Sequence, residues 1–169
     1  GALSATATTG DITDSGNLTI TGAATFITGV DESNIVLDSS GNAFSNSVEM
    51  RADAGGEDFG NITFVDSAGI DFATSAGSNG DLYINSSTDG TVGGNLSVTA
   101  TTGNITDTVA VVTTGSSTSS FTTSATNGTI DLSTPASLAG AVTINTAGAS
   151  GNATIDNGTT ALIIAASSI

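Results

Sequence analysis

The chain has 169 residues, a formal net charge of −15 from sixteen acidic residues and one basic residue, and no cysteine. The scarcity of Lys and Arg excludes nucleic acid as a partner, because nothing neutralises the phosphates, and the lack of cysteine excludes a disulfide framework. No apolar run approaches the roughly 20 residues that a membrane helix needs, so we expect no membrane insertion.

Short runs of alternating apolar and polar residues begin near the amino end and recur along the chain. They are NLTITG at 17–22, DLYINS at 81–86, LSVTA at 96–100, GTIDLS at 128–133 and AVTINT at 141–146. A period of two is typical of a β-strand with one buried face, and the runs end in Gly, Asn, Asp or Ser. We therefore predict an all-β chain. The residues expected to face inward are Leu18, Ile20, Leu96, Val98, Ile105, Ile130, Leu132, Val142, Ile144 and Ile155.

An internal repeat favours a solenoid over a sandwich or barrel. The stretch GALSATATTGDITDS at 1–15 returns as GNLSVTATTGNITDT at 94–108, with eleven of fifteen positions identical. We interpret residues 1–93 as a first repeat unit of about four coils and residues 94–169 as a second unit of about three. The surplus in the first unit, near 77–93, is one more coil, which a solenoid tolerates. Together the units predict one continuous rod, a parallel β-helix of about seven coils.

The two ends of the chain are suited to each other. The last residues, AASSI, would run into a copy of the first residues much as TVGG at 91–94 runs into NLSVTATTG. Neither end has the polar cap that a soluble solenoid needs. We therefore predict self-association, either between separate copies or as tandem continuation. The expected contact residues are Gly1, Ala2, Leu3, Ile163, Ile164 and Ile169.

Several stretches carry a family resemblance. They are GNLSVTATTGNITDT, SFTTSATNGTIDLST, AGAVTINTAGASGNATIDNGTTAL and the opening GALSATATTGDITDSGNLTITGAATF. They resemble the β-strand repeats of large bacterial surface proteins, similar to filamentous haemagglutinin-like adhesins. The resemblance implies a right-handed parallel β-helix, a location at the cell surface or outside the cell, and an adhesive or structural role. It implies no catalytic residues. We expect the secretion signal to lie outside this chain.

The acidic residues are candidates for metal binding or catalysis. Parallel β-helices also serve polysaccharide-acting enzymes, but one Arg and no His leave little from which to build a substrate site, so we predict that the chain is not an enzyme. The one cofactor that the acidic residues suggest is calcium, because carboxylate oxygens are ligands that it prefers. Its candidate ligands are Asp11, Asp14, Asp107, Glu57 and Asp58.

We therefore predict a non-enzymatic, extracellular β-solenoid that builds a filament or stalk, with itself as the main partner. The alternative is an adhesin segment that binds a surface glycan or a neighbouring cell. For an adhesin, Tyr83 with Asp81 and Asp89 forms the candidate binding patch.

The single Arg51 is expected to pair with Glu49 or Asp53. Eight Asn-x-Ser/Thr sequences are explained by turn chemistry at strand entries.

Overall fold

The structure is a computed structural model. It describes the whole chain except residues 31, 53–59, 73–80, 85–90, 93 and 114–116. The described residues form twenty short parallel strands and no helix. The strands stack as a β-solenoid of about six turns, which confirms the predicted fold class. The described residues include no helix long and apolar enough to cross a membrane.

Two broad sheets form the faces of the solenoid. Sheet A has the order β1 (Leu3–Ala7), β4 (Ala24–Thr28), β7 (Val48–Ala52), β10 (Asp81–Ile84), β9 (Ile70–Phe72), β13 (Ile105–Asp107), β16 (Thr129–Leu132) and β19 (Asn152–Ile155). Sheet B has the order β2 (Ile12–Thr13), β5 (Ile35–Leu37), β8 (Ile62–Asp66), β12 (Leu96–Ala100), β15 (Ser119–Thr126), β18 (Ala141–Ala147) and β20 (Ile163–Ile164).

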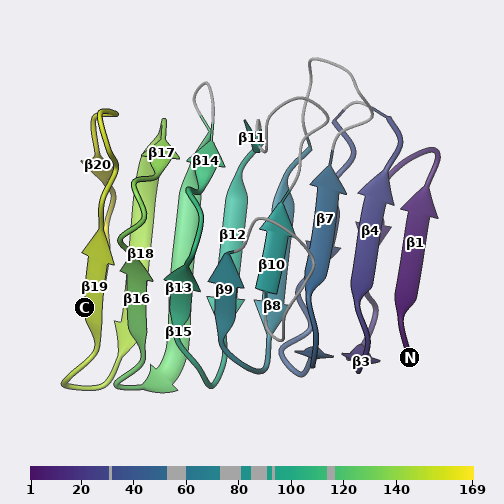
Figure 1. The fold of residues 1–169 in the computed structure, drawn as a ribbon, viewed down its shortest axis with the longest axis horizontal. Helices are drawn as coiled ribbons and strands as arrows, with labels where there is room; N and C mark the ends of the chain where they lie inside the picture. Colours follow the sequence, from purple (N-terminus) through teal and green to yellow (C-terminus); the bar gives the residue numbers. More distant parts are fainter. Residues whose placement is uncertain (31, 53–59, 73–80, 85–90, 93, 114–116) are drawn as a thin grey trace.

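Two small sheets form the edges. Sheet C pairs β3 (Thr19–Ile20) with β6 (Ala43–Phe44), and sheet D contains β11 (Thr91–Val92), β14 (Val112–Thr113) and β17 (Ser137–Leu138). In Figure 1, β3 lies at the lower edge, and β11, β14 and β17 lie at the upper edge. In the same view, the strands of sheet A, the nearer sheet, point upward, and successive coils advance from right to left. The solenoid therefore winds in a right-handed sense.

The surplus segment of the first half contributes two described strands, β10 and β11, to the solenoid of about six turns. Strand β10 lies in sheet A between β7 and β9, with Leu82 aligned to both Val48 and Phe72. In sheet B, by contrast, β8 pairs directly with β12 over five residues. The segment's described strands, β10 and β11, therefore join sheets A and D, and neither joins sheet B. The division into units at residues 93 and 94 stays an interpretation of the sequence.

The two copies of the repeated motif lie in different sheets. The chain first winds from sheet A to sheet B and returns through sheet C, as β1, β2 and β3 do. From β12 onward it winds from sheet B to sheet A and returns through sheet D. Consequently LSATA in β1 belongs to sheet A, whereas LSVTA in β12 belongs to sheet B. The same motif occupies opposite faces because its second copy begins half a turn later in the winding, and the edge strand moves from sheet C to sheet D.

The core is a thin layer between sheets A and B. Most strands alternate buried and half-buried residues, as β8 and β12 do over their whole length. Eight of the ten residues expected to face inward are buried, and Leu18 and Ile155 are partly buried against the same core. Phenylalanines fill its wider parts: the ring centroids of Phe44 and Phe64 are 5.2 Å apart, and those of Phe72 and Phe121 are 6.0 Å apart.

Candidate functional site

The predicted calcium ligands Asp11 and Asp14 bind the backbone of the next coil. Asp11 Oδ1 accepts hydrogen bonds from the backbone N–H of Asn34 at 2.7 Å and from its side-chain amide at 3.3 Å. Asp14 Oδ2 accepts from the Asn42 side-chain amide at 2.6 Å, and its two oxygens accept from two backbone N–H groups of the turn after β5. Burial alone would raise the pKa of Asp14, but these hydrogen bonds outweigh it and hold the pKa below its usual value.

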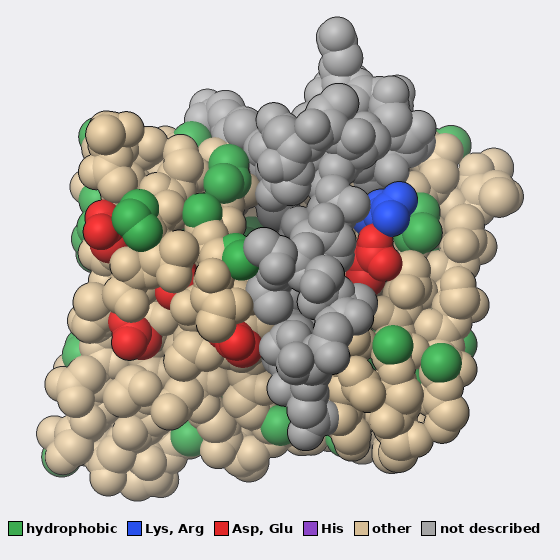
Figure 2. Space-filling model, viewed as in Figure 1, with side chains coloured by type: hydrophobic (Ala, Val, Ile, Leu, Met, Phe, Trp, Pro, Cys, Tyr) green, Lys and Arg blue, Asp and Glu red, His purple; other side chains and the backbone are tan. Residues whose placement is uncertain are grey.

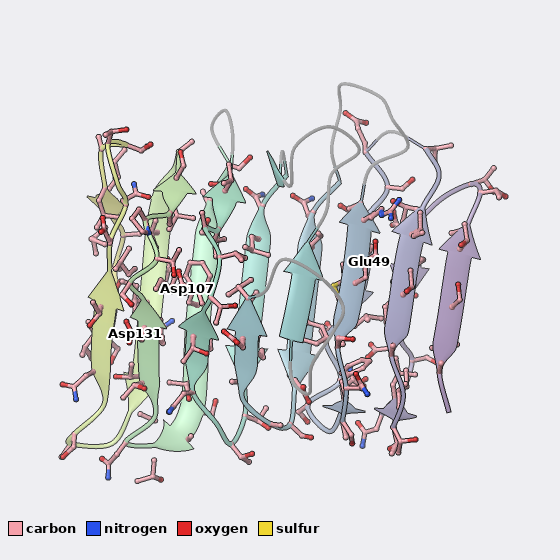
Figure 3. The ribbon with its side chains drawn as sticks, viewed as in Figure 1. Glu49, Asp107 and Asp131 are labelled. Atoms are coloured by element: carbon pink, nitrogen blue, oxygen red, sulfur yellow. The ribbon has the colours of Figure 1, made fainter. Side chains whose placement is uncertain are left out.

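Asp107 has the equivalent place in the second copy of the motif. Its Oδ1 accepts a hydrogen bond from the backbone N–H of Thr134, in the turn after β16. Its Oδ2 is buried and has no hydrogen-bond partner. Burial raises the pKa of Asp107, and the negative charge of Asp131 adds to the rise. Figure 3 shows Asp107 and Asp131 on the neighbouring strands β13 and β16, with Glu49 farther along the sheet.

The described residues do not assemble these carboxylates into a metal centre. Nowhere in that part of the chain do three or more Asp, Glu, His or Cys side chains converge as metal ligands would. Glu57 and Asp58 lie outside the described residues. On the near face in Figure 2, acidic side chains are scattered among uncharged polar ones. Calcium binding therefore stays a prediction of the sequence.

A row of side-chain amides, which we call the asparagine ladder, precedes the strands of sheet B. Asn34 Oδ1 accepts from the backbone N–H of Asn61, Asn61 Oδ1 from that of Asn95, and Asn95 Oδ1 from that of Thr118, each at 2.8 Å. Asp11 begins the row through its bond to Asn34. The ladder thus satisfies one backbone donor per coil where the chain enters the sheet.

Sequence reasoning treated the Asn-x-Ser/Thr sequences as turn chemistry and did not identify this ladder. A signal was present, because Asp or Asn directly precedes the first inward residue of β2, β5, β8 and β12. Two further amides connect coils in the same way: Asn104 Oδ1 accepts a hydrogen bond from the backbone N–H of Thr129, and Asn127 Oδ1 accepts one from the backbone N–H of Ser150. These amides serve as connections between coils.

Asp66 is a buried carboxylate that the sequence analysis missed. It is 2% exposed and accepts hydrogen bonds at Oδ1 from the backbone N–H groups of Phe44 and Ala68. Burial raises its pKa. It lines a cavity of about 380 Å³ at the lower edge, formed by residues 43–45 and 66–69. Its position could have been read from the alternation, because Ile62, Phe64 and Asp66 are the inward residues of β8.

The residues predicted to mediate self-association lie exposed at the two ends of the rod. Gly1 and Ala2 are exposed, and the Gly1 amino group donates to Thr21 Oγ1 at 2.8 Å. Five large apolar residues are exposed among the described residues, all in the first strand or the last eight residues. They are Leu3 at 37%, Leu162 at 40%, Ile163 at 53%, Ile164 at 51% and Ile169 at 68%.

Arg51, Glu49 and the described part of the predicted binding patch lie on sheet A. Arg51 donates two hydrogen bonds to Glu49 Oε1, from Nε at 2.9 Å and from Nη2 at 2.7 Å. Tyr83 and Asp81 belong to β10, whose side chains lie outside the description, as does Asp89. The described carboxylates with raised pKa values, Asp66 and Asp107, bind the backbone of neighbouring coils. The described polar side chains thus serve mainly to connect one coil to the next by hydrogen bonds.

Comparison with known proteins supports a repeat architecture. A family described as "Repeats of unknown function (DUF5649)" matches residues 1–51, less than a third of the chain. No curated protein and no solved structure gave a match.

Proposed function

We propose that the chain is a non-enzymatic structural segment of an extracellular filament or stalk, which lengthens when further coils are added at its ends. The observation that supports this proposal most strongly is the distribution of exposed apolar side chains. Over the described length of the rod, large apolar residues are buried or half-buried, and only the terminal coils expose them. A sheet edge of this kind presents unpaired backbone groups together with apolar surface, which is a template for another coil.

The lateral surface supports a spacer better than a specific binding site. Most outward positions of sheet B are small, polar and half-buried, as at Thr63, Ser97, Thr99, Thr122 and Thr143. The net charge of −15 makes neighbouring rods repel one another at low salt. Extension along the axis is therefore favoured over lateral aggregation.

Negative-stain electron microscopy of the diluted chain, with and without a calcium chelator, tests this function. Long, thin, uniform rods are the expected result, and their loss on chelation would locate divalent cations at the junctions. Monodisperse particles of the length of a single chain, at every protein and salt concentration, would contradict the filament. They would support the adhesin alternative, in which the segment binds a glycan or a neighbouring cell.

A further inference from the structure

One file of inward residues runs along the whole of sheet B, and we call it the sheet B file. The register of successive strands aligns Ile12 with Ile35 and then Ile62, and aligns Val142 with Ile164 at the other end. In order, the file contains Ile12, Ile35, Ile62, Leu96, Ser119, Val142 and Ile164. Both of its end members are isoleucines. Ile12 is partly buried, and Ile164 is 51% exposed.

Sheet A contains a corresponding file, which we call the sheet A file. At one end Leu3 aligns with Ala24, and Ala24 aligns with Val48. The register continues through Leu82 and Phe72 to Asp107, the one carboxylate of the file, and then to β16, where Leu132 aligns with Ile155. Leu3 is 37% exposed and Ile155 is partly buried, so this file also ends in a large apolar residue on each side.

The two ends of the rod match in the spacing of these files along the chain. At the first end, Ile12 in sheet B lies nine positions after Leu3 in sheet A. At the last end, Ile164 in sheet B lies nine positions after Ile155 in sheet A. Because all strands in both sheets are parallel, placing the first coil on the last coil would continue both files at once, without reversing either sheet.

We propose that another copy of this repeat stacks head to tail on each end, with β1 of one copy pairing with β19 of the copy before it and β2 pairing with β20 of that same preceding copy. This proposal rests on the proposed function and specifies its junction. Leu3 then lies over Ile155 of the preceding copy, and Ile12 lies over its Ile164. The backbone ladders and both files of inward residues continue from copy to copy, with apolar residues on each side of the junction.

Charge sets the conditions for docking. Asp11 and Asp14 belong to the first coil, and the exposed Asp156 follows β19 in the last coil, so the approaching ends are both acidic. Salt of about 1 M reduces the Debye length to about 3 Å and screens this repulsion. Docking is therefore expected to strengthen as salt increases.

Cysteine pairs test the register, and the chain has no cysteine of its own to interfere. In-register neighbouring parallel strands are about 4.8 Å apart, within the Cα separations that a disulfide bridges. Within one copy, Leu3 and Ile155 lie at opposite edges of eight strands, roughly 34 Å apart at that spacing, so they can react only between copies. The aligned variant is Leu3→Cys with Ile155→Cys. The matched control is Leu3→Cys with Ile164→Cys, whose cysteines lie in different sheets.

After oxidation in high salt, the aligned variant is expected to give a ladder of covalent dimers, trimers and longer chains on a non-reducing gel. The control variant is expected to give no such ladder. A second aligned pair, Ile12→Cys with Ile164→Cys, repeats the test in sheet B, and circular dichroism of each reduced variant checks folding. Rods without a ladder in either aligned pair, or equal ladders in the control, would overturn this register and leave the proposed function standing. Neither rods nor ladders would overturn both.

Discussion

Individual residues that break the apolar pattern of the core are the clearest test of the packing at residue scale. Ser119 is 3% exposed and lies in the sheet B file between Leu96 and Val142. Its hydroxyl oxygen is buried and has no hydrogen-bond partner. A buried hydroxyl without a partner costs free energy, because the hydrogen bonds that it makes to water in the unfolded chain are not replaced.

We expect Ser119→Val to raise the free energy of unfolding by about 1 kcal/mol, because it replaces an unpartnered hydroxyl with apolar surface in an apolar file. The matched control is Ser120→Val, at the adjacent outward-facing position of the same strand, where little change is expected. Urea unfolding followed by circular dichroism measures both. A loss of stability in Ser119→Val would show that the file has no room for the larger side chain.

Asp66 has a raised pKa, so the folded chain binds its proton more tightly than the unfolded chain does. Its contribution to stability is therefore largest at acid pH and is lost as the pH rises through the folded-state pKa. We expect Asp66→Asn to raise the free energy of unfolding at neutral pH and to flatten its decline as the pH rises above about 4, the unfolded-state pKa, as measured by urea unfolding at a series of pH values.

Asp14 provides the control with the opposite sign. Its pKa is lowered in the folded chain, so its contribution is present above the unfolded-state pKa and is lost as the pH falls through the folded-state value. Asp14→Asn should therefore lower the free energy of unfolding at neutral pH. The same direction of change in both variants would contradict these assignments.

At the scale of the strand, the alternation of residues predicted which side chains face inward but not which sheet each strand joins. LSATA and LSVTA have the same pattern, and either sheet buries the same alternate residues. The sheet is decided by pairing with strands far away in the sequence, which an alternation of period two does not encode. For the same reason, the alternation around β10 did not indicate that β10 joins sheet A while β8 pairs directly with β12 in sheet B.

The closest contacts between coils occur where glycine precedes a strand of sheet B. A Cβ placed on Gly94 would lie 2.2 Å from the carbonyl oxygen of Gly60 in the neighbouring coil. That atom is backbone, so relief requires the coils to move apart. We expect Gly94→Ala to lower the free energy of unfolding by about 1–3 kcal/mol, as overpacking does, measured by urea unfolding.

Gly16→Ala is the matched control for Gly94→Ala. Gly16 has no heavy atom within 4 Å of its would-be Cβ, so the substitution should leave stability almost unchanged. Equal effects of the two substitutions would mean that the loss comes from the general backbone preference of glycine and not from contact between coils.

At the scale of the whole molecule, the fold class and the exposure of the predicted end residues both follow from the sequence, whereas the candidate calcium ligands were not brought together in the described residues. The difference has a physical cause. Apolar periodicity and repetition determine stacking directly, but carboxylates placed at turns can bind either a metal or the backbone of the next coil. Here Asp11, Asp14 and Asp107 bind the backbone.

The measurement that tests the central claim most directly is electron cryo-microscopy of rods assembled in high salt. Coils that continue across each junction predict a strand spacing of about 4.8 Å along the rod axis without interruption. They also predict a repeat of roughly 34–38 Å per chain, from the seven and eight strands of the two faces. Strands running along the rod axis, or a gap in the strand spacing between copies, would contradict a filament built by continuing the solenoid.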